Sequence, residues 1–239
     1  MTESLRRRTA LQAGGGAALL SWLPGLRAQP QSTAERPGWP AWEAFKAQFI
    51  NEGGRVISDD AGGGQTYSEG QAYALFFALV ANDRTTFDKL LRWTENNLCD
   101  GDMTARLPAW LWGKRPDGTW GVIDSNAASD ADLWIAYALG EAGRLWNVRT
   151  YRALSALLAA RILREETAQL PGLGLTLLPA PQGFAQKDGR WRLNPSYMPM
   201  HLMHWLAAED PQPEWKQLVD SSLKVIQGAS PKGLSLIHI

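Results

Sequence analysis

Apolar side chains recur every three or four residues along most of the chain after position 40, which is the spacing of one face of a helix. Residues 68–80 are apolar on nearly every side, as in a helix buried in a core. The clearest one-sided stripe runs through Phe87, Leu90, Leu91, Thr94 and Leu98. Further helices are predicted over residues 41–50, 129–146, 151–163, 198–207 and 214–226. The pattern therefore predicts about seven helices.

Strand patterns are few and short. Residues 172–178 and 183–193 combine glycine, proline and brief apolar runs, and they predict one small β-hairpin over one end of the helices. No tandem repeat of fixed length is visible, which argues against a repeat array. A strong helical period with little strand period favours an all-α fold of stacked helical hairpins.

The first 28 residues have the three parts of an export signal. Arginines occupy positions 6–8, residues 10–23 are modestly apolar, and residues 26–28 form the predicted cleavage site. The run 7–12 resembles the twin-arginine export pattern, with an ordinary Sec signal as the alternative. The apolar stretch is too short and weak to span a bilayer stably. We therefore expect a periplasmic or secreted protein, with residues 29–38 as a polar linker.

Composition narrows the function classes. The 239 residues carry 24 Lys and Arg against 24 Asp and Glu, so no basic field exists to attract nucleic acid. There are 12 Trp but only 6 Phe and 5 Tyr, and flat indole faces stack well on sugar rings. The single cysteine, Cys99, excludes an internal disulfide and is expected to be a small buried hydrophobe. His201 and His204 lack a third ligand, so no metal site is expected.

Glu69 is the first candidate for chemistry. Glycoside hydrolysis needs a protonated carboxylic acid beside the leaving oxygen and a second carboxylate across the sugar. Glu69 begins the apolar helix, with Ser68 or Thr66 as its expected cap and Tyr73 nearby. Apolar surroundings would raise its pKa, whereas the helix dipole would lower it. An acidic residue in a first turn is also a common structural feature, so both interpretations stay open here.

A second group of carboxylates lies at residues 124–132. Ser129 and Asp132 have the spacing of a capping box, which favours a structural role for Asp132. Asp130 has no such role, and we expect it to face the same cavity as Glu69. Asp124 is either a turn former or a substrate contact.

Trp110 and Trp112 lie between these two groups, after a proline and before a glycine. Their segment is expected to be a loop or a short extended piece. At least one of the two indoles should be exposed there as a sugar platform, while the other packs in the core.

These segments together resemble glycoside hydrolase family 8, and within it the periplasmic cellulases encoded with bacterial cellulose synthases. The resemblance covers roughly residues 39–233. It is carried by the signature at 128–146 and by residues 68–71, 107–114 and 194–197. It implies an (α/α)₆ barrel of helical hairpins, no metal or organic cofactor, and inverting hydrolysis of internal β-1,4-glucosidic bonds in cellulose.

The same resemblance implies roles for particular residues. Glu69 would be the general acid, and Asp130 would bind and help to distort the sugar at the cleavage point. Further residues would line the glucan cleft: Trp110 or Trp112, Tyr197 and Trp191. The implied partners are a β-1,4-glucan and the cellulose-export machinery.

The sequence departs from the family pattern in two respects. The barrel has twelve helices, whereas about seven are predicted here. The family's base, an aspartate in a Tyr-Asp-Ala-like motif, has no counterpart after Gly183. Residues 234–239 resemble a non-native tail. We therefore expect a C-terminally truncated fragment, aggregation-prone because helix faces lose their neighbours and inactive because the base is missing.

Three alternatives stay open. The same fold could act as a chitosanase, xylanase or lichenase. The protein could also be a non-catalytic glucan-binding factor of cellulose export. A polysaccharide lyase on a helical toroid is less favoured, because lyases need basic groups to neutralise uronic acids and the region around Glu69 and Asp130 is not basic.

Overall fold

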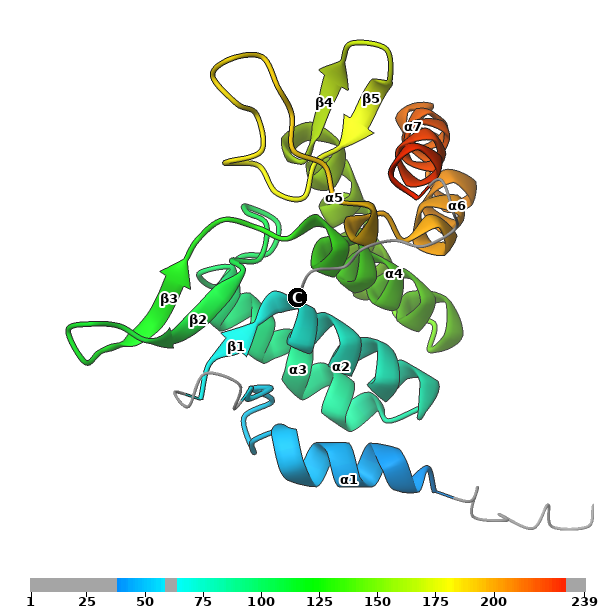
Figure 1. The fold of residues 1–239 in the computed structure, drawn as a ribbon. Coiled ribbons are helices and arrows are strands. Elements are labelled where there is room, and N and C mark those ends of the chain that lie inside the picture. Colours follow the sequence, from blue (N-terminus) through cyan, green and yellow to red (C-terminus); the bar gives the residue numbers. More distant parts are fainter. Residues whose placement is uncertain (1–37, 59–63, 231–239) are drawn as a thin grey trace, which may run out of the picture. The chain divides into compact units, whose positions relative to one another are not determined.

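The computed structural model describes residues 38–58 and 64–230 (Figure 1). The predicted export signal, nearly all of the linker and the predicted tail lie outside these residues. The described part contains seven α-helices: α1 (Pro40–Phe49), α2 (Ser68–Val80), α3 (Arg84–Leu98), α4 (Ser129–Leu145), α5 (Arg149–Glu165), α6 (Met200–Glu209) and α7 (Glu214–Ala229). The prediction of a mainly helical fold with about seven helices is confirmed. None of these helices is long and apolar enough to cross a membrane.

Consecutive helices pack against each other as hairpins, with α2 and α4 at the centre. Helix α2 contacts α3 and α4, α4 also contacts α5 and α6, and α6 contacts α7 (Figure 1). Both helices carry small, fully buried side chains, such as Ala72 and Ala78 on α2 and Ala136 on α4. Small side chains let neighbouring helix backbones approach closely.

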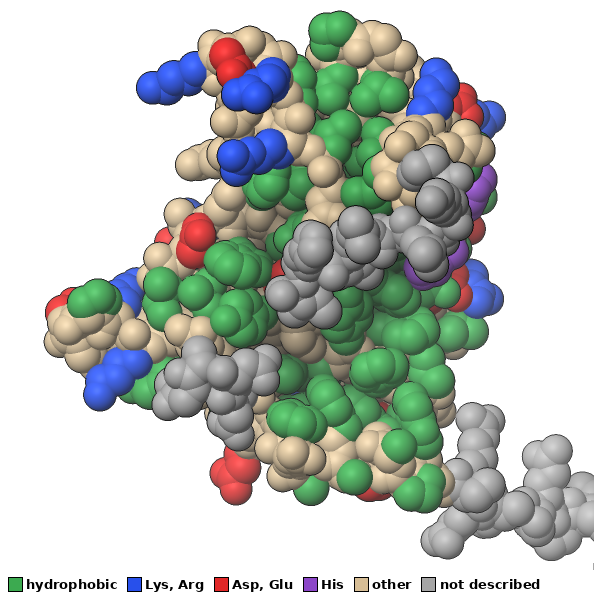
Figure 2. All heavy atoms as spheres, in the orientation of Figure 1, with side chains coloured by type: hydrophobic (Ala, Val, Ile, Leu, Met, Phe, Trp, Pro, Cys, Tyr) green, Lys and Arg blue, Asp and Glu red, His purple; other side chains and the backbone are tan. Residues whose placement is uncertain are grey.

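Some large apolar side chains remain on the surface of these helices. Tyr73 and Val80 on α2 and Leu145 on α4 are all exposed. Figure 2 shows apolar side chains gathered along α1, α2 and α4 on the face drawn there.

A three-stranded antiparallel sheet lies beside α2 and α3. It consists of β1 (Thr66–Tyr67), β2 (Leu111–Lys114) and β3 (Trp120–Asp124), in that spatial order. The sequence indicated only a loop or an extended piece around Trp112. The partner strands could not be recognised, because β1 has two residues and pairs across more than forty positions of the sequence.

The predicted hairpin exists, but its strands differ from the prediction. It is formed by β4 (Thr167–Leu170) and β5 (Gly174–Leu177), whereas residues 183–193 contribute only one isolated bridge, Ala185 to Trp191. Gly172 and Gly174 have φ of 78° and 82°, a backbone conformation that suits glycine. This tight turn lets residues 167–170 pair with β5 locally, so the more distant segment is not needed as a partner.

The cap predicted for α2 does not form. Its N-cap residue is Tyr67, which makes no side-chain cap. Thr66 Oγ1 instead donates to Val56 O (2.6 Å) and accepts from Arg55 Nε (2.8 Å). Ser68 Oγ donates to Glu69 Oε2 (3.2 Å). A tertiary partner has therefore taken the Thr66 hydroxyl, and the adjacent Glu69 carboxylate has taken the Ser68 hydroxyl, so neither is left to cap the helix.

One buried amide, Gln71, joins α2 to the loop before β1 and to α3. Its Oε1 accepts from Val56 N (2.6 Å), and its Nε2 donates to Thr94 Oγ1 (2.9 Å) and Gly54 O (3.2 Å). Gln71 and Thr94 are both completely buried. A buried polar side chain is tolerated when its groups are all paired, so Gln71 fixes the start of α2 in the core.

Candidate active site

Glu69 lies in the first turn of α2, which follows β1 directly in the sequence. Its Oε1 accepts a hydrogen bond from Trp110 Nε1 (3.0 Å), and its Oε2 accepts one from Ser68 Oγ (3.2 Å). Burial raises the pKa of the Glu69 carboxyl, although hydrogen bonds from its own backbone, Trp110 and Ser68 pull the other way. The carboxyl is therefore biased towards its protonated form compared with an ordinary surface glutamate.

Backbone hydrogen bonds place Trp110 beside Glu69. Ser68 N donates to Trp110 O (2.9 Å), and Trp110 N donates to Asn126 O (2.7 Å). The Trp110 ring also lies 5.6 Å from the Tyr67 ring, measured between centroids. The indole is thus held between the start of α2 and the loop that precedes α4, with its N–H directed at the Glu69 carboxylate.

Asp130 lies in the first turn of α4 and shares the surroundings of Glu69. Burial, followed by the negative charge of Glu69, raises the pKa of Asp130 to about 6. Its Oδ1 is buried without a hydrogen-bond partner among the described residues. The two carboxyls are therefore close enough to interact electrostatically. That both face one cavity stays a prediction.

Two tyrosines stand next to these carboxyls. Burial and then the charges of Asp130 and Glu69 raise the pKa of both Tyr73 and Tyr197. Tyr73 comes from α2, and Tyr197 ends the short 3₁₀ helix η1 (Pro195–Tyr197). Helix α6 starts after Pro199, two residues later than predicted, because η1 occupies the preceding turn. Both rings can contact a sugar held at the carboxyls.

A cavity of about 200 Å³ adjoins this group. Its lining residues are Trp110, Asp124, Asn126, Ala127, Ala128, Pro179, Ala180, Phe184 and Tyr197. Three of the predicted substrate contacts, Trp110, Asp124 and Tyr197, thus come together here. Asp124 forms a turn, since its Oδ1 accepts from Asn126 N (2.9 Å), and its role as a substrate contact stays a prediction. Trp191 is not part of this lining.

Trp112 lies apart from Trp110, although the sequence grouped them. Its ring packs 5.4 Å from Trp93 and 5.3 Å from Trp120, with the Arg55 guanidinium 4.4 Å away. Trp110 lies before β2 begins, whereas Trp112 lies within it, so strand alternation does not tie the two rings to one face. The pairing of β2 with β3 also shifts register between Leu111 and Trp112, with Ile123 of β3 as the extra residue.

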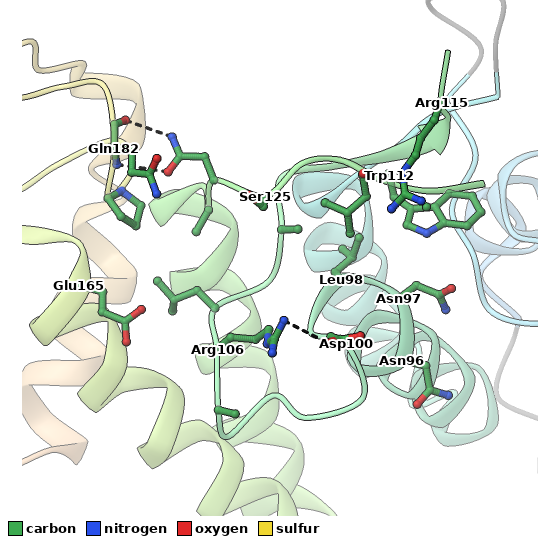
Figure 3. A pocket seen from close by; sticks show the side chains of 18 residues that line it. Asn96, Asn97, Leu98, Asp100, Arg106, Trp112, Arg115, Ser125, Glu165 and Gln182 are labelled. Atoms are coloured by element: carbon green, nitrogen blue, oxygen red, sulfur yellow. Dashed lines mark hydrogen bonds and ion pairs between the residues drawn. The ribbon is translucent and has the colours of Figure 1, made fainter. Parts of the chain in front are cut away.

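Trp112 lines a different cavity, of about 700 Å³, with polar side chains such as Asn97, Arg106 and Gln182 (Figure 3). Neither Glu69 nor Asp130 belongs to that lining, nor to the lining of the 200 Å³ cavity. Trp112 therefore does not share the cavity that Trp110 and Tyr197 line.

Asn126 is a site residue that the sequence did not reveal. Its Nδ2 donates to Gln182 O (3.0 Å), and its Oδ1 accepts from Gln182 N (3.2 Å), across 56 positions of sequence; Figure 3 marks these bonds at Gln182. They hold the loop that carries Phe184 against the segment that carries Trp110. No local pattern signals such a pair, because the partner is a backbone group far along the chain.

Cys99 and His201, which could in principle react or bind a metal ion, pack against other side chains. Cys99 is completely buried, as predicted. The His201 ring packs 5.2 Å from Trp134. Within the described ranges, no three His, Cys, Asp or Glu side chains are arranged to hold a metal ion.

Comparison with known proteins identifies the family. The family model "Glycosyl hydrolases family 8" matches residues 23–236. The chain belongs to glycoside hydrolase family 8. An endoglucanase of Pseudomonas fluorescens SBW25 is 46% identical over 204 residues, which cover 84% of this chain and 51% of that protein. An endoglucanase of Escherichia coli O157:H7 is 48% identical over 197 residues, 82% of this chain and 53% of the relative.

A solved structure of this family shows the same helical arrangement. The crystal structure of an endo-1,4-D-glucanase from Vibrio fischeri ES114 aligns with a TM-score of 0.79 at 52% identity, covering 82% of this chain and 57% of that one. The family resemblance and the expectation of part of an (α/α)₆ barrel are therefore confirmed. The chain spans about half the length of the curated relatives that it matches.

Proposed function

We propose that the protein is an endo-1,4-β-glucanase that cleaves internal bonds of a cellulose-like glucan with inversion. The observation that carries this proposal is the Glu69 carboxyl, oriented by Trp110 and Ser68, with its pKa raised by burial and with Asp130 beside it. A raised pKa increases the fraction of the carboxyl that is protonated at a given pH, and the protonated form can donate to a glycosidic oxygen. The family and the relatives named endoglucanase support the same reaction.

In this proposal Glu69 is the general acid. Its proton moves to the leaving oxygen as the glycosidic bond breaks, and the resulting carboxylate keeps its hydrogen bonds from Trp110 and Ser68. Those bonds strengthen as charge develops on the carboxylate. Trp110 therefore both aims the acid and stabilises the state that follows proton transfer.

Asp130 has a different role in this proposal. Its half-buried carboxyl accepts a hydrogen bond from a sugar hydroxyl at the cleavage point, and this bond favours a distorted ring that approaches the oxocarbenium-like transition state. Tyr197 and Asp124 contact neighbouring sugar units in the adjoining cavity.

Inversion also requires a base that activates water, about 6.5–9.5 Å from the acid. Among the described residues we assign none to that role, because Asp130 is assigned to sugar binding and Asp124 accepts a hydrogen bond from Asn126 N. We therefore propose that this chain alone binds glucan with little turnover. A protein that spans the full length of the relatives would complete the reaction.

The test compares this chain with a protein extended to the full length of its relatives. Reducing ends released from carboxymethylcellulose measure turnover, and calorimetry with cello-oligosaccharides measures binding. In the longer protein, Glu69→Gln should lower kcat by about 100-fold or more while binding persists, because general acid catalysis typically contributes about 10²–10⁴-fold. Glu52→Gln, at an exposed turn, is the matched control and should leave both unchanged.

Undiminished turnover in Glu69→Gln would refute its assignment as the acid. Rapid turnover by this chain alone would refute the missing-base proposal. A panel of chitosan, xylan and mixed-linkage glucan tests specificity, and glucan binding without any turnover in the longer protein would favour the non-catalytic alternative.

We further propose that the protein is exported and acts with a bacterial cellulose-producing system. The arginine triplet at 6–8 and the apolar stretch at 10–23 support export. Cell fractionation of a tagged chain carrying Arg7→Lys and Arg8→Lys tests this: retention of the variant in the cytoplasm supports a twin-arginine route, whereas unchanged export supports a Sec signal. An unprocessed wild-type chain that stays in the cytoplasm would contradict the proposal.

A further inference from the structure

Two acidic side chains without a role in the proposed reaction are completely buried. Asp132 lies in the first turn of α4, and Glu166 is the C-cap residue of α5; each has 0% of its surface exposed. The capping box predicted for Ser129 and Asp132 is absent, since α4 has no side-chain cap. None of the four carboxylate oxygens pairs with an N–H or hydroxyl group of the described residues. Each carboxyl instead has the other as its interacting neighbour across the contact between α4 and α5.

A hydrogen bond between two carboxyl groups requires a proton on one of them, because an ionised carboxylate only accepts. Burial raises the pKa of both Asp132 and Glu166 well above their usual range, and neighbouring negative charges raise it further. The titratable groups that surround the pair are Glu69 on α2, Cys99 after α3, Asp130 on α4 and Glu165 on α5. All four are acids, and Arg161 of α5 pairs with Glu165 (2.5 Å), so a proton is the counter-charge that we assign to the pair.

The pair lies where three segments meet at the start of α4. Leu178 N donates to Glu166 O (2.8 Å), and the next residue, Pro179, accepts from Ser129 N (3.0 Å). The chain leaving β5 is therefore bonded to the end of α5 and to the start of α4. The contact between Asp132 and Glu166 closes the same junction through side chains. Asp130, two residues before Asp132, lies in the helical turn that this junction holds.

We propose that Asp132 and Glu166 share a single proton at neutral pH, and that this shared proton is a positioning device that holds the first turn of α4, and with it Asp130, in place beside Glu69. Neither residue touches the glucan. The proton itself is independent of any enzymatic activity, whereas the consequence for sugar binding rests on the function proposed above.

The proton can be counted directly. At about pH 8, unfolding of the wild-type chain should release about one proton more than unfolding of the double variant Asp132→Asn, Glu166→Gln, which keeps a hydrogen bond but cannot titrate. Because the native state holds a proton that the unfolded chain has lost, the free energy of unfolding should fall as pH rises above about 4, with a shallower slope in the double variant. Glu52→Gln is the surface control.

Infrared spectroscopy gives a second readout of the same proton. The native wild-type chain should show the carbonyl stretch of a buried protonated carboxyl at this pH, and the double variant should lack it. Equal proton release from the two proteins would overturn the proposal, and so would a difference of two protons, since both carboxyls would then be neutral.

The positioning role is tested by binding of cello-oligosaccharides. The double amide variant should bind within about threefold of wild type, whereas Glu166→Ala, which leaves Asp132 without its partner, should bind at least about tenfold more weakly. Equal weakening in both variants, or none in Glu166→Ala, would overturn this role. If Glu166→Ala does not fold, the titration of Asp130 in the double variant decides: a retained raised pKa supports the role, and its loss refutes it. If the wild-type chain does not bind glucan, the proposed function is refuted, but the measurement of the shared proton still stands.

Discussion

One substitution made at two glycines should have opposite effects on stability. Gly140 lies within α4, where the Trp205 ring of α6 lies against its backbone. A Cβ built on Gly140 would overlap Trp205 Cη2 and come within 2.9 Å of Cζ2 and 3.0 Å of Ser155 Oγ. Gly228 lies within α7, and a Cβ there would meet nothing within 4 Å.

The magnitude follows from two opposing terms. Replacing glycine by alanine in a helix stabilises it by about 0.5–1 kcal/mol, and Gly228→Ala should show up to this gain. At Gly140 the same gain is outweighed by overpacking, which costs about 1–3 kcal/mol. The ring cannot simply move away, because Trp205 Nε1 donates to Glu141 Oε1 at 2.9 Å and that charged hydrogen bond contributes about 1.5–3 kcal/mol. Gly140→Ala should therefore destabilise the chain by about 2 kcal/mol.

Urea unfolding monitored by tryptophan fluorescence and by far-UV circular dichroism measures both effects. The two variants should have the same dependence on urea and different midpoints, Gly140→Ala lower and Gly228→Ala equal to or above wild type. A Gly140→Ala chain at least as stable as Gly228→Ala would refute the close approach of α6 to α4.

Other perturbations test the site and its supports. In Glu69→Gln the pKa of Asp130, followed by NMR of its carboxyl carbon, should fall below about 6, because the charge of Glu69 is one of the two effects that raise it. It should stay above 3.8, because burial, the larger of the two, remains. In Trp110→Phe the pKa of Glu69 should rise, since a hydrogen bond that stabilises the carboxylate is lost; an unchanged titration would contradict that bond. Gln71→Leu strands several buried polar partners and should destabilise the chain by about 2–5 kcal/mol in urea unfolding; a loss below about 1 kcal/mol would contradict the network. Burial alone would raise the pKa of Asp83, but hydrogen bonds lower it to about 2, so wild-type stability should fall as pH drops from about 4 to about 2; Asp83→Asn should lack this part of the acid loss.

Much of the helical architecture could be predicted from the sequence. Helix α2 has the predicted bounds 68–80, and α4 begins at the predicted residue 129. Apolar residues repeat about every 3.6 positions along each helix and mark the face that becomes buried, so this face can be recognised without knowing which element packs on it. Glu69 and Asp130 stood out for a related reason, since both occupy first turns of strongly apolar helices.

Features that depend on distant partners could not be predicted. The sequence grouped Trp112 with Trp110, but Trp110 is held beside Glu69 before β2 begins, whereas Trp112 lies within β2 and packs against Trp93 and Trp120. The sequence also assigned Asp132 to a helix cap, because local spacing is the only information available before folding. Its actual partner, Glu166, approaches only when α5 has packed on α4.

The sequence alone determined which segments become helices and which two carboxyls begin them, because those properties are local. Only the tertiary structure decided the state of these carboxyls. Desolvation and the charge of Glu69 raise the pKa of Asp130 to about 6 only after α2 and α4 have packed side by side. Proximity and burial are properties of the packed helices together, so no single segment of the chain contains them.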